Sequence, residues 1–311
     1  MAKQSKQPFA FSDEKLNELA FNSILNRWKL KAVNRFTWKN LPPNIESRKI
    51  EQLLFDFGSC IFVKDKERGY MVLQNNAFEY YDVNYRPTLS TAIGFSYIKP
   101  YNVYWGDECE KTLVNTDGDK IFDEYNTGIL IQNNPLAISA YEQIIYKVWQ
   151  LYNIERALDV NVQQLGLNNV IVASIDDESN VQILLNNIKK HKAFNAISED
   201  NLMNQVKTLD LKPIYFGSDL HELKKDVEYD LEVILGYNNQ GIEKKHEVLL
   251  RDEINANNEM IESELQTSMK QRKFACDLIN DFFGTNISIE CDVKGPEEET
   301  EQEETTYERA D

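Results

Sequence analysis

The chain has 311 residues, a formal net charge of −17 and a hydrophobic content of 42%. A chain of this length can bury a sizeable core and suits one large or two ordinary domains. No run of about 18 apolar residues occurs, which argues against a membrane protein. The N-terminal segment lacks a signal-peptide pattern, so the protein is expected to stay in a cytosol.

The charge is distributed unevenly along the chain. Residues 297–311 contain eight carboxylates and one arginine, a net of −7, and residues 291–311 are predicted to form an acidic disordered tail. Residues 1–40 contain eight lysines and arginines against three carboxylates, a net of +5. Because an acidic chain repels nucleic acid, any contact with nucleic acid has to come from local basic patches.

The four cysteines are far apart in the sequence: Cys60, Cys109, Cys276 and Cys291. They form no CxxC pair and no Cys/His cluster, which argues against a zinc site and, in a reducing compartment, against a disulfide framework. We interpret them as core or surface thiols.

Residues 1–45 are predicted to form an N-terminal arm and a first helix. Apolar residues recur every four positions between Asp13 and Trp38, which is typical of an amphipathic helix: Leu16, Ala20, Ile24, Trp28, Ala32 and Phe36. A basic stripe has the same spacing: Arg27, Lys31, Arg35 and Lys39. The sequence NLPPN at residues 40–44 ends the helix, because proline lacks an amide donor and restricts the residue before it. The basic stripe is either a solvated face or a contact for nucleic acid.

Residues 46–134 are predicted to form a small antiparallel β-rich module. Short β-branched and aromatic runs are separated there by Gly, Pro, Asn and Asp: CIFVKD (60–65), GYMVLQ (69–74), FEYYDV (78–83), GFSYI (94–98), NVYWG (102–106) and TGILIQ (127–132). Asn115, Asp117 and Asp119 resemble part of a calcium loop, but no glutamate follows at the EF-hand spacing. We therefore interpret Asp117-Gly118 as a hairpin turn.

Residues 135–167 are predicted to form one long helix, with Asn134-Pro135 as its start and Gly166 as its end. At 1.5 Å per residue this helix would run roughly 45 Å, well beyond the usual globular helix of about 11 residues. Such a length indicates a stem rather than a compact globular core.

The rest of the chain alternates between short strands and long helices. A strand–helix–strand unit is predicted over residues 168–215, with strands in NNVIVASI (168–175) and QVKTLDL (205–211). A returning helix over residues 216–238 starts with Asp219 and Glu222 at capping-box spacing and ends at Gly236. Residues 239–255 form a polar loop, and residues 256–290 form a last helix, capped by Gly284, and a strand. The predicted fold class is therefore α+β, with a long-helix stem, a small β-rich module and a strand–helix–strand unit.

The sequence lacks the motifs of the common enzyme classes: Walker A, GxGxxG after a strand, GxSxG and HExxH. None of the three histidines, His191, His221 and His246, has a partner at metal or nucleophile spacing. Asp176, Asp177 and Glu178 offer carboxylates for a two-metal nuclease, but their place before a predicted helix favours capping and turn formation. We predict no enzymatic activity, no cofactor and no metal.

Two basic patches remain. Lys189, Lys190, His191 and Lys192 end a predicted helix, where the helix dipole favours positive charge. Lys244, Lys245 and His246 lie in the polar loop, where no helix end requires them. Flanking glutamates leave this second patch little net charge, so it suits weak, sequence-blind phosphate contacts, especially when an oligomer repeats them.

Four stretches of the chain are similar to a known family: FTWKNLPPNI (36–45), DFGSCIFVKD (56–65), LGYNNQGIEKKHEVLLRDEINANNEMIES (235–263) and FACDLINDFFGTNISIE (274–290). Together with the order of elements over most of residues 15–290, they resemble phage portal proteins. Their sequences are most similar to those of the upper collar, or head–tail connector, proteins of small picovirus-type short-tailed phages. In those terms residues 46–134 are the wing, 135–167 and 216–238 the stem, 168–215 the clip and 239–255 the channel loop.

The resemblance implies a ring of twelve copies at a capsid vertex of the virion, assembled in the host cytoplasm. Double-stranded DNA would be packaged and ejected through it, and its partners would be the major capsid protein, the lower collar and tail proteins and the packaging ATPase, with no membrane. Lys244 and Lys245 would occupy the channel loop, where family members carry a lysine pair. His246 departs from the pattern, because an acidic residue commonly follows that pair. Further candidates for lining the stem are Lys207, Lys212, Lys224 and Lys225.

Three hypotheses about function can be separated by experiment. The favoured one is a structural ring that conducts DNA, because long paired helices and loop lysines occur without catalytic motifs. The alternatives are a nucleic-acid-binding regulator that uses the N-terminal basic helix, and a metal nuclease that uses Asp176, Asp177 and Glu178.

Overall fold

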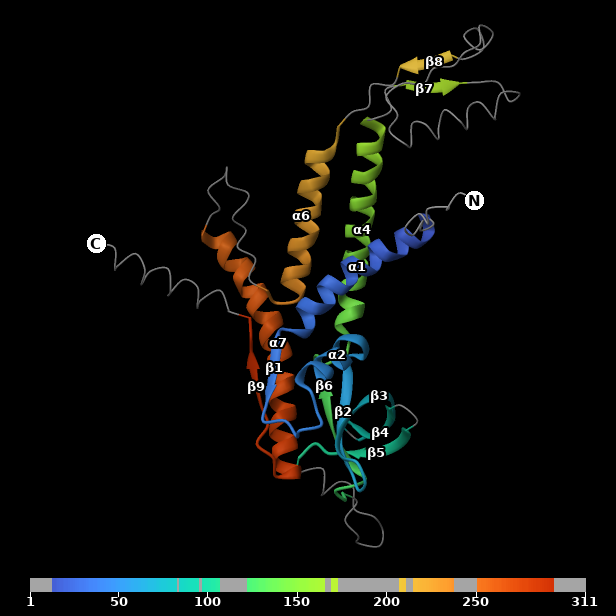
Figure 1. Cartoon of the computed structure of the whole chain (residues 1–311). Helices are drawn as coiled ribbons and strands as arrows, with labels where there is room; N and C mark the ends of the chain where they lie inside the picture. The colour runs from blue at the N-terminus through green and yellow to red at the C-terminus, as the bar shows by residue number, and fades with distance from the viewer. Residues whose placement is uncertain are drawn as a thin grey trace, which may run out of the picture. The chain divides into compact units, whose positions relative to one another are not determined.

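The computed structural model describes residues 13–82, 84–94, 97–106, 122–165, 169–172, 207–210, 215–237 and 251–293. Contacts between Cα atoms divide the chain into two compact units, one formed by Met1–Trp149 with Glu228–Asp311 and the other by Gln150–Val227. Helices and strands are both major components, in agreement with the α+β prediction (Figure 1).

Helix α1 spans Asp13–Val33. Ile24, Trp28 and Ala32 of the predicted apolar stripe are buried, whereas Leu16 and Ala20 are exposed. Residues four apart on a helix differ in direction by about 40°, so a stripe with this spacing turns gradually around the helix. Towards the N-terminus, its side chains therefore leave the face that Ile24, Trp28 and Ala32 bury. The prediction that the whole stripe is buried is therefore wrong at its N-terminal end.

The prediction that the first helix continues to Trp38 is also wrong. Phe36–Lys39 forms strand β1, in which Phe36 and Trp38 are buried and alternate with side chains that are more exposed. This alternation is that of a strand with one covered face. β1 pairs antiparallel with β9 (Ser288–Cys291), near the far end of the chain, with Phe36 opposite Cys291. This long-range partner explains why a helical period fails here.

Helix α2 spans Ser47–Phe57, within the region predicted to be β-rich. Its buried residues are Ile50, Glu51, Leu54 and Phe55, which lie on one face of a helix. Gly58 ends α2 in the left-handed conformation, with φ of 74°, and its amide donates to the Leu54 carbonyl at 3.0 Å. The sequence analysis missed this helix because buried Glu51 interrupts its apolar pattern.

Within residues 46–134, the described strands form a closed five-stranded barrel with the strand order β2-β3-β4-β5-β6. The strands are β2 (Ser59–Asp65), β3 (Gly69–Tyr81), β4 (Pro87–Gly94), β5 (Tyr97–Val103) and β6 (Thr127–Gln132). Neighbouring strands are antiparallel except β5 and β6, which are parallel, so the prediction of an all-antiparallel module is wrong for this pair.

The predicted runs agree with the barrel only in part. TGILIQ coincides with β6 and CIFVKD lies in β2, but most of FEYYDV continues β3 instead of forming a strand of its own. GFSYI joins the end of β4 to the start of β5. β4 itself was missed, because Pro, Ser, Thr and Ala dilute its strand signal. The proposed turn at Asp117-Gly118 lies outside the described residues.

Strand β2 is buried on both faces, which explains its unbroken apolar run. Cys60 and Phe62 pack into a core shared with α2, β1, β6, α7 and β9, while Ile61 and Val63 point into the barrel interior. A strand covered on both sides needs apolar residues at every position rather than at alternate ones.

Burial makes two cysteine thiols of this core unreactive. It raises the pKa of Cys276 to about 12 and raises that of Cys60 still further. Because the thiolate is the nucleophile, we expect iodoacetamide at pH 8 to leave both unmodified in the folded protein and to label both in urea. The unfolded chain releases these protons nearer pH 9, so the free energy of unfolding should fall as pH rises from about 9 towards 12. Rapid labelling of Cys60 under native conditions, detected by mass spectrometry, would contradict this.

Helix α4 spans Ala140–Leu165 and starts later than predicted. The Asn134 side chain caps a separate turn, accepting from the amides of Leu136 and Ile138 at 3.1 and 3.0 Å. The hydroxyl of Ser139 caps α4 instead, accepting from the amide of Glu142 at 3.0 Å.

Helix α6 (Gly217–Ile234) returns antiparallel to α4, and α7 (Arg251–Phe283) follows (Figure 1). Two ion pairs bridge α4 and α6, Lys147 to Asp230 at 2.6 Å and Lys224 to Glu155 at 2.9 Å. Strands β7 (Asn169–Val172) and β8 (Lys207–Asp210) pair antiparallel. The helices formed by described residues include none with the length and apolarity to cross a membrane.

Candidate functional site

The predicted channel residues are described only in part. Lys244, Lys245, His246 and Lys212 lie outside the described residues. Lys207 is the first residue of β8, opposite Val172. Lys224 and Lys225 are both on α6, so the structure brings only these two together. Their role in a channel stays a prediction.

Lys224 is held by a partner within its own unit. Its ammonium lies 2.9 Å from a carboxylate oxygen of Glu155, and its side chain is 25% exposed. Lys225 is more exposed.

The described residues that precede the predicted channel loop are anchored at the end of α6. The amide of Gly236 donates to the Val233 carbonyl and that of Tyr237 to the Glu232 carbonyl, both at 2.9 Å. With Gly236 at φ of 70°, this is a Schellman motif and confirms the predicted helix end. The Tyr237 hydroxyl then donates to the Lys31 carbonyl at 2.6 Å. The chain therefore leaves α6 for the loop at a point tied to α1.

The basic stripe of the N-terminal segment is occupied by internal partners. Arg27 lies 2.8 Å from Glu228 and Lys31 lies 3.0 Å from Glu232, both on α6. Arg35 and Lys39 follow the end of α1 and are not on that helix, and Lys39 lies 3.1 Å from Glu290 of β9. The stripe thus connects α1 and β1 to neighbouring elements, and the described residues give no support to a nucleic-acid contact along this helix.

Arg35 is the buried member of the stripe. Its guanidinium donates to the carbonyls of Leu235 at 2.9 Å and Ala32 at 3.2 Å. Burial, followed by the charge of Arg272, lowers the pKa of Arg35 to about 10. The side chain therefore stays charged at neutral pH, where it satisfies the carbonyl at the end of α6.

Replacing Arg27 or Lys31 by alanine should have a small effect on stability. Each ion pair is partly exposed, so we expect each variant to lose no more than about 1 kcal/mol in urea unfolding, less at high salt. We also expect no loss of duplex DNA binding by the full chain in a filter assay. Tight duplex binding by the wild type that both substitutions abolish would instead support the regulator hypothesis.

A buried polar cluster lies at the centre of the first unit. Arg272 of α7 donates from Nε and Nη2 to the two carboxylate oxygens of Glu51 of α2, each at 2.8 Å. The indole of Trp38 donates to the same carboxylate at 2.9 Å, and Asn133 accepts from the guanidinium. The exposed fractions of the Arg272 and Glu51 side chains are 1% and 2%. The cluster is closed to ligands and joins α7, α2, β1 and the chain after β6.

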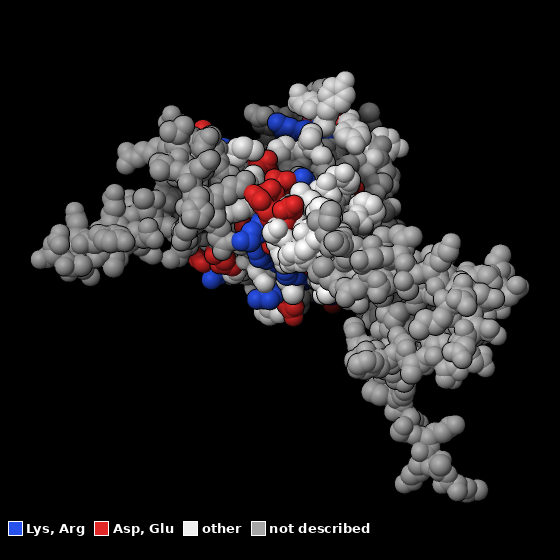
Figure 2. Space-filling model, turned by 90° about the horizontal axis from the view of Figure 1, so that it is seen from above, with Lys and Arg blue, Asp and Glu red and all other residues white. Residues whose placement is uncertain are grey.

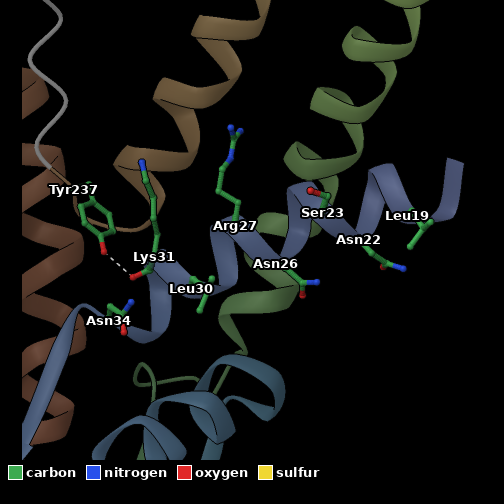
Figure 3. Close-up of a pocket in the computed structure, with 9 residues that line it drawn as sticks. All are labelled: Leu19, Asn22, Ser23, Asn26, Arg27, Leu30, Lys31, Asn34 and Tyr237. Carbon is green, nitrogen blue, oxygen red and sulfur yellow. Dashed lines mark hydrogen bonds between the residues drawn. The ribbon is translucent and has the colours of Figure 1, made fainter. Parts of the chain in front are cut away.

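A groove of about 770 Å³, here called the α1 groove, opens beside α1. In Figure 3, Arg27 and Lys31 point to one side of the helix, whereas Leu19, Asn26 and Leu30 point to the other. The groove is lined by Leu19, Asn22, Ser23, Asn26, Arg27, Leu30, Lys31, Asn34 and Tyr237. A second groove of about 420 Å³ lies between α1 and α2 and shares Asn26, Leu30 and Asn34 with the first. Amide and apolar side chains make up most of the α1 groove, whereas Lys29, Glu46, Arg48 and Lys49 bring charge to the second groove. Such a lining suits a protein contact better than catalysis.

Figure 2 shows Lys and Arg next to Asp and Glu on the described part of one face, rather than a field of one sign. Within the described residues, no group of three His, Cys, Asp or Glu side chains is placed to hold a metal ion. Asp176, Asp177 and Glu178 lie outside those residues, so the nuclease hypothesis is not tested by the structure.

Both grooves and the polar cluster were not predicted from the sequence. Leu16, Leu19 and Leu30 carried a usable signal, since they share one helix face, but only Leu16 belongs to the predicted four-residue stripe. The cluster had no local signal, because Glu51 and Arg272 are far apart in the chain.

Comparisons with known proteins connect this architecture to a family. A family model described as "Phage Connector (GP10)" matches residues 11–294. The chain is similar to one in the structure "Portal and tail of native bacteriophage P68", with 14% identity, a TM-score of 0.41 and coverage of 98% of this chain and 99% of that one. It is also similar to one in "Neck of empty GTA particle computed with C6 symmetry", with 9% identity, a TM-score of 0.43 and coverage of 98% and 91%.

The two structural likenesses are too distant to carry an argument, so the assignment rests on the family model. That match extends from before α1 to just beyond β9. It includes the four stretches whose sequences resemble those of connector proteins. The chain therefore belongs to the phage connector family, and its function is that of a head–tail connector.

Proposed function

We propose that twelve copies of this chain close into a ring at a capsid vertex of the virion, and that double-stranded DNA passes through the ring during packaging and ejection. The observation that carries this proposal is the match of the connector family over residues 11–294. The ring would join the major capsid protein to the lower collar and tail proteins and would receive DNA from a packaging ATPase. It would assemble in the host cytoplasm.

The channel loop supplies the contact with DNA in this proposal. Gly236 and Tyr237 hold the start of the loop against α7 and α1, since Gly236 packs on Leu265 and Tyr237 bonds to Lys31. A loop that leaves a fixed point can present Lys244, Lys245 and His246 at the same height in every copy. Repetition of weak phosphate contacts around a bore would damp DNA motion without gripping the duplex.

The charge of the chain supports passage rather than tight binding. Each copy carries a net charge of −17, which repels the phosphate backbone. The cations of the described N-terminal stripe are engaged by Glu228, Glu232, Glu290 and backbone carbonyls. Weak contacts between the loop and phosphate, within an acidic ring, would let DNA pass through the ring without being bound tightly.

Electron microscopy of the purified protein tests the ring. We expect closed rings with a central hole and twelvefold symmetry over a range of protein concentrations. Monomers or open filaments at every concentration would contradict the proposal, because a head-to-tail interface gives a ring only when its rotation closes.

The double variant Lys244→Glu with Lys245→Glu tests the role of the loop. We expect rings to assemble but particles to retain less packaged DNA, because each chain then places two negative charges where two positive ones met phosphate. Lys189→Glu with Lys190→Glu makes the same charge change outside the loop and is the matched control. DNA retention is measured by nuclease protection. Equal retention by both variants would remove the loop from the proposal.

A further inference from the structure

Helix α1 carries a leucine stripe that no described residue covers. Leu16, Leu19 and Leu30 are 48%, 46% and 59% exposed. Together with the exposed Ser23 and Asn26 they have the spacing i, i+3, i+7, i+10 and i+14, which places them along one side of the helix. Alternation of three and four residues is the spacing with which one helix packs along another. The α1 groove borders this stripe. Leu30 lines both the α1 groove and the second groove.

Helix α4 carries a complementary aromatic face in the same unit. Tyr146 and Trp149 are 65% and 53% exposed and lie one turn apart. Lys147, between them, reaches Asp230 of α6 at 2.6 Å. Two residues rotate a helix by about 200°, so Trp149 points away from that ion pair. The Trp149 ring has no hydrogen bond, ion pair or ring contact within the described part of the chain.

Charged residues of opposite sign lie beside these two faces. On the α1 side, Arg48 and Lys49 of α2 are exposed at the second groove, which Glu46 also lines. On the α4 side, Glu142 is exposed one turn before Tyr146, on the same side of the helix. Opposite charges at the rims of two apolar faces favour their mutual contact and disfavour contact of either face with itself.

A contact between two different faces of one chain is head-to-tail, the type that generates rings. Contact between two identical leucine stripes would instead give a closed pair with basic rim against basic rim. A second copy of the chain is therefore the partner that fits the α1 groove, since it brings an exposed tryptophan of the kind that anchors protein interfaces.

We propose that Tyr146 and Trp149 of one copy pack into the α1 groove and against the leucine stripe of the next copy. This inference rests on the ring proposed above and assigns one of its subunit contacts. Glu142 then lies near Arg48 and Lys49. Each copy uses its α1 face toward one neighbour and its α4 face toward the other.

Cross-linking between cysteines tests the contact directly. In a background with Cys109→Ser and Cys291→Ser, a short bismaleimide is added to assembled Leu30→Cys and Trp149→Cys proteins. Each single variant should stay uncross-linked, an equal mixture should give covalent dimers, and the double variant should give a ladder of covalent oligomers. Leu30→Cys with Ile98→Cys, at a barrel position that is more exposed than Trp149, is the control and should give no ladder.

Assembly of Trp149→Ala gives a second, independent readout. We expect its association, followed by mass photometry, to be roughly tenfold weaker or more than that of the wild type. Tyr85→Ala, which removes an 88% exposed tyrosine from the barrel, should leave association unchanged. Wild-type rings that give neither the ladder nor the Trp149 effect would overturn this contact and leave the ring intact. A wild type that never forms rings would instead overturn the proposed function.

Discussion

Replacement of Arg272 by alanine is expected to lower the free energy of unfolding by about 3–5 kcal/mol, because it leaves the Glu51 carboxylate buried without its partner. Both side chains are almost fully buried, and the guanidinium lies over the Phe36 ring at 4.3 Å as well as against Glu51. Without it, the carboxylate keeps only the Trp38 indole among the partners described above. Urea unfolding followed by tryptophan fluorescence measures the loss.

The double variant Glu51→Ala with Arg272→Ala isolates the pair itself. We expect it to lose clearly less stability than the two single variants added together, because no buried charge is then left alone. Lys273→Ala, at the next position of α7, removes an exposed cation and should change stability by less than about 0.5 kcal/mol. A loss below about 1 kcal/mol for Arg272→Ala would show that the cluster does not hold the first unit together.

Gly58→Ala is the second substitution with a large expected effect. Gly58 has φ of 74°, and a Cβ there would lie 2.0 Å from the Ala137 carbonyl oxygen and 2.7 Å from the Ser139 nitrogen. Both atoms belong to the backbone that leads into α4, so no side-chain rotation relieves the clash. The Gly58 carbonyl also accepts from the Asn133 amide at 2.9 Å. We expect a loss of about 3 kcal/mol or more, seen as little soluble folded protein or a much lower urea midpoint.

Gly69→Ala separates the clash from the backbone conformation. Gly69 has the same φ of 74°, but nothing lies within 4 Å of the position its Cβ would take. Its loss should therefore be only the cost of placing alanine in the left-handed region, about 1–2 kcal/mol. Equal losses for the two variants would mean that the segment before α4 moves freely and does not pack against the end of α2.

Local patterns predicted the elements whose reasons are local. Gly236 was expected to end α6, and it does so through a Schellman motif that needs left-handed backbone. TGILIQ was expected to be a strand and coincides with β6, because a short β-branched run with turn residues on both sides has few other options. The wording of four stretches also indicated the connector family, which the family match over residues 11–294 bears out.

Elements that depend on distant partners were predicted poorly. Phe36 and Trp38 continue the helical period of α1, yet they form β1 because β9 supplies their hydrogen bonds. Asn134-Pro135 has the signature of a helix start, but Ser139 caps α4 once Asn134 is used in a turn. The partners of the N-terminal cations could not be predicted for the same reason, because the acidic residues that pair with Arg27 and Lys31 lie on α6, far along the chain.

By itself, the sequence determined the local turns and helix ends, the acidic character of the chain and its membership of the connector family, because propensity, charge and family wording are properties of residues and their near neighbours. Only the tertiary structure decided that Glu51 and Arg272 form a buried pair, that the N-terminal cations are occupied, and that the Leu30 and Trp149 faces are left exposed. The physical reason is that burial and pairing at a position depend on which distant residues pack against it. The local pattern of apolar residues does not identify those distant residues.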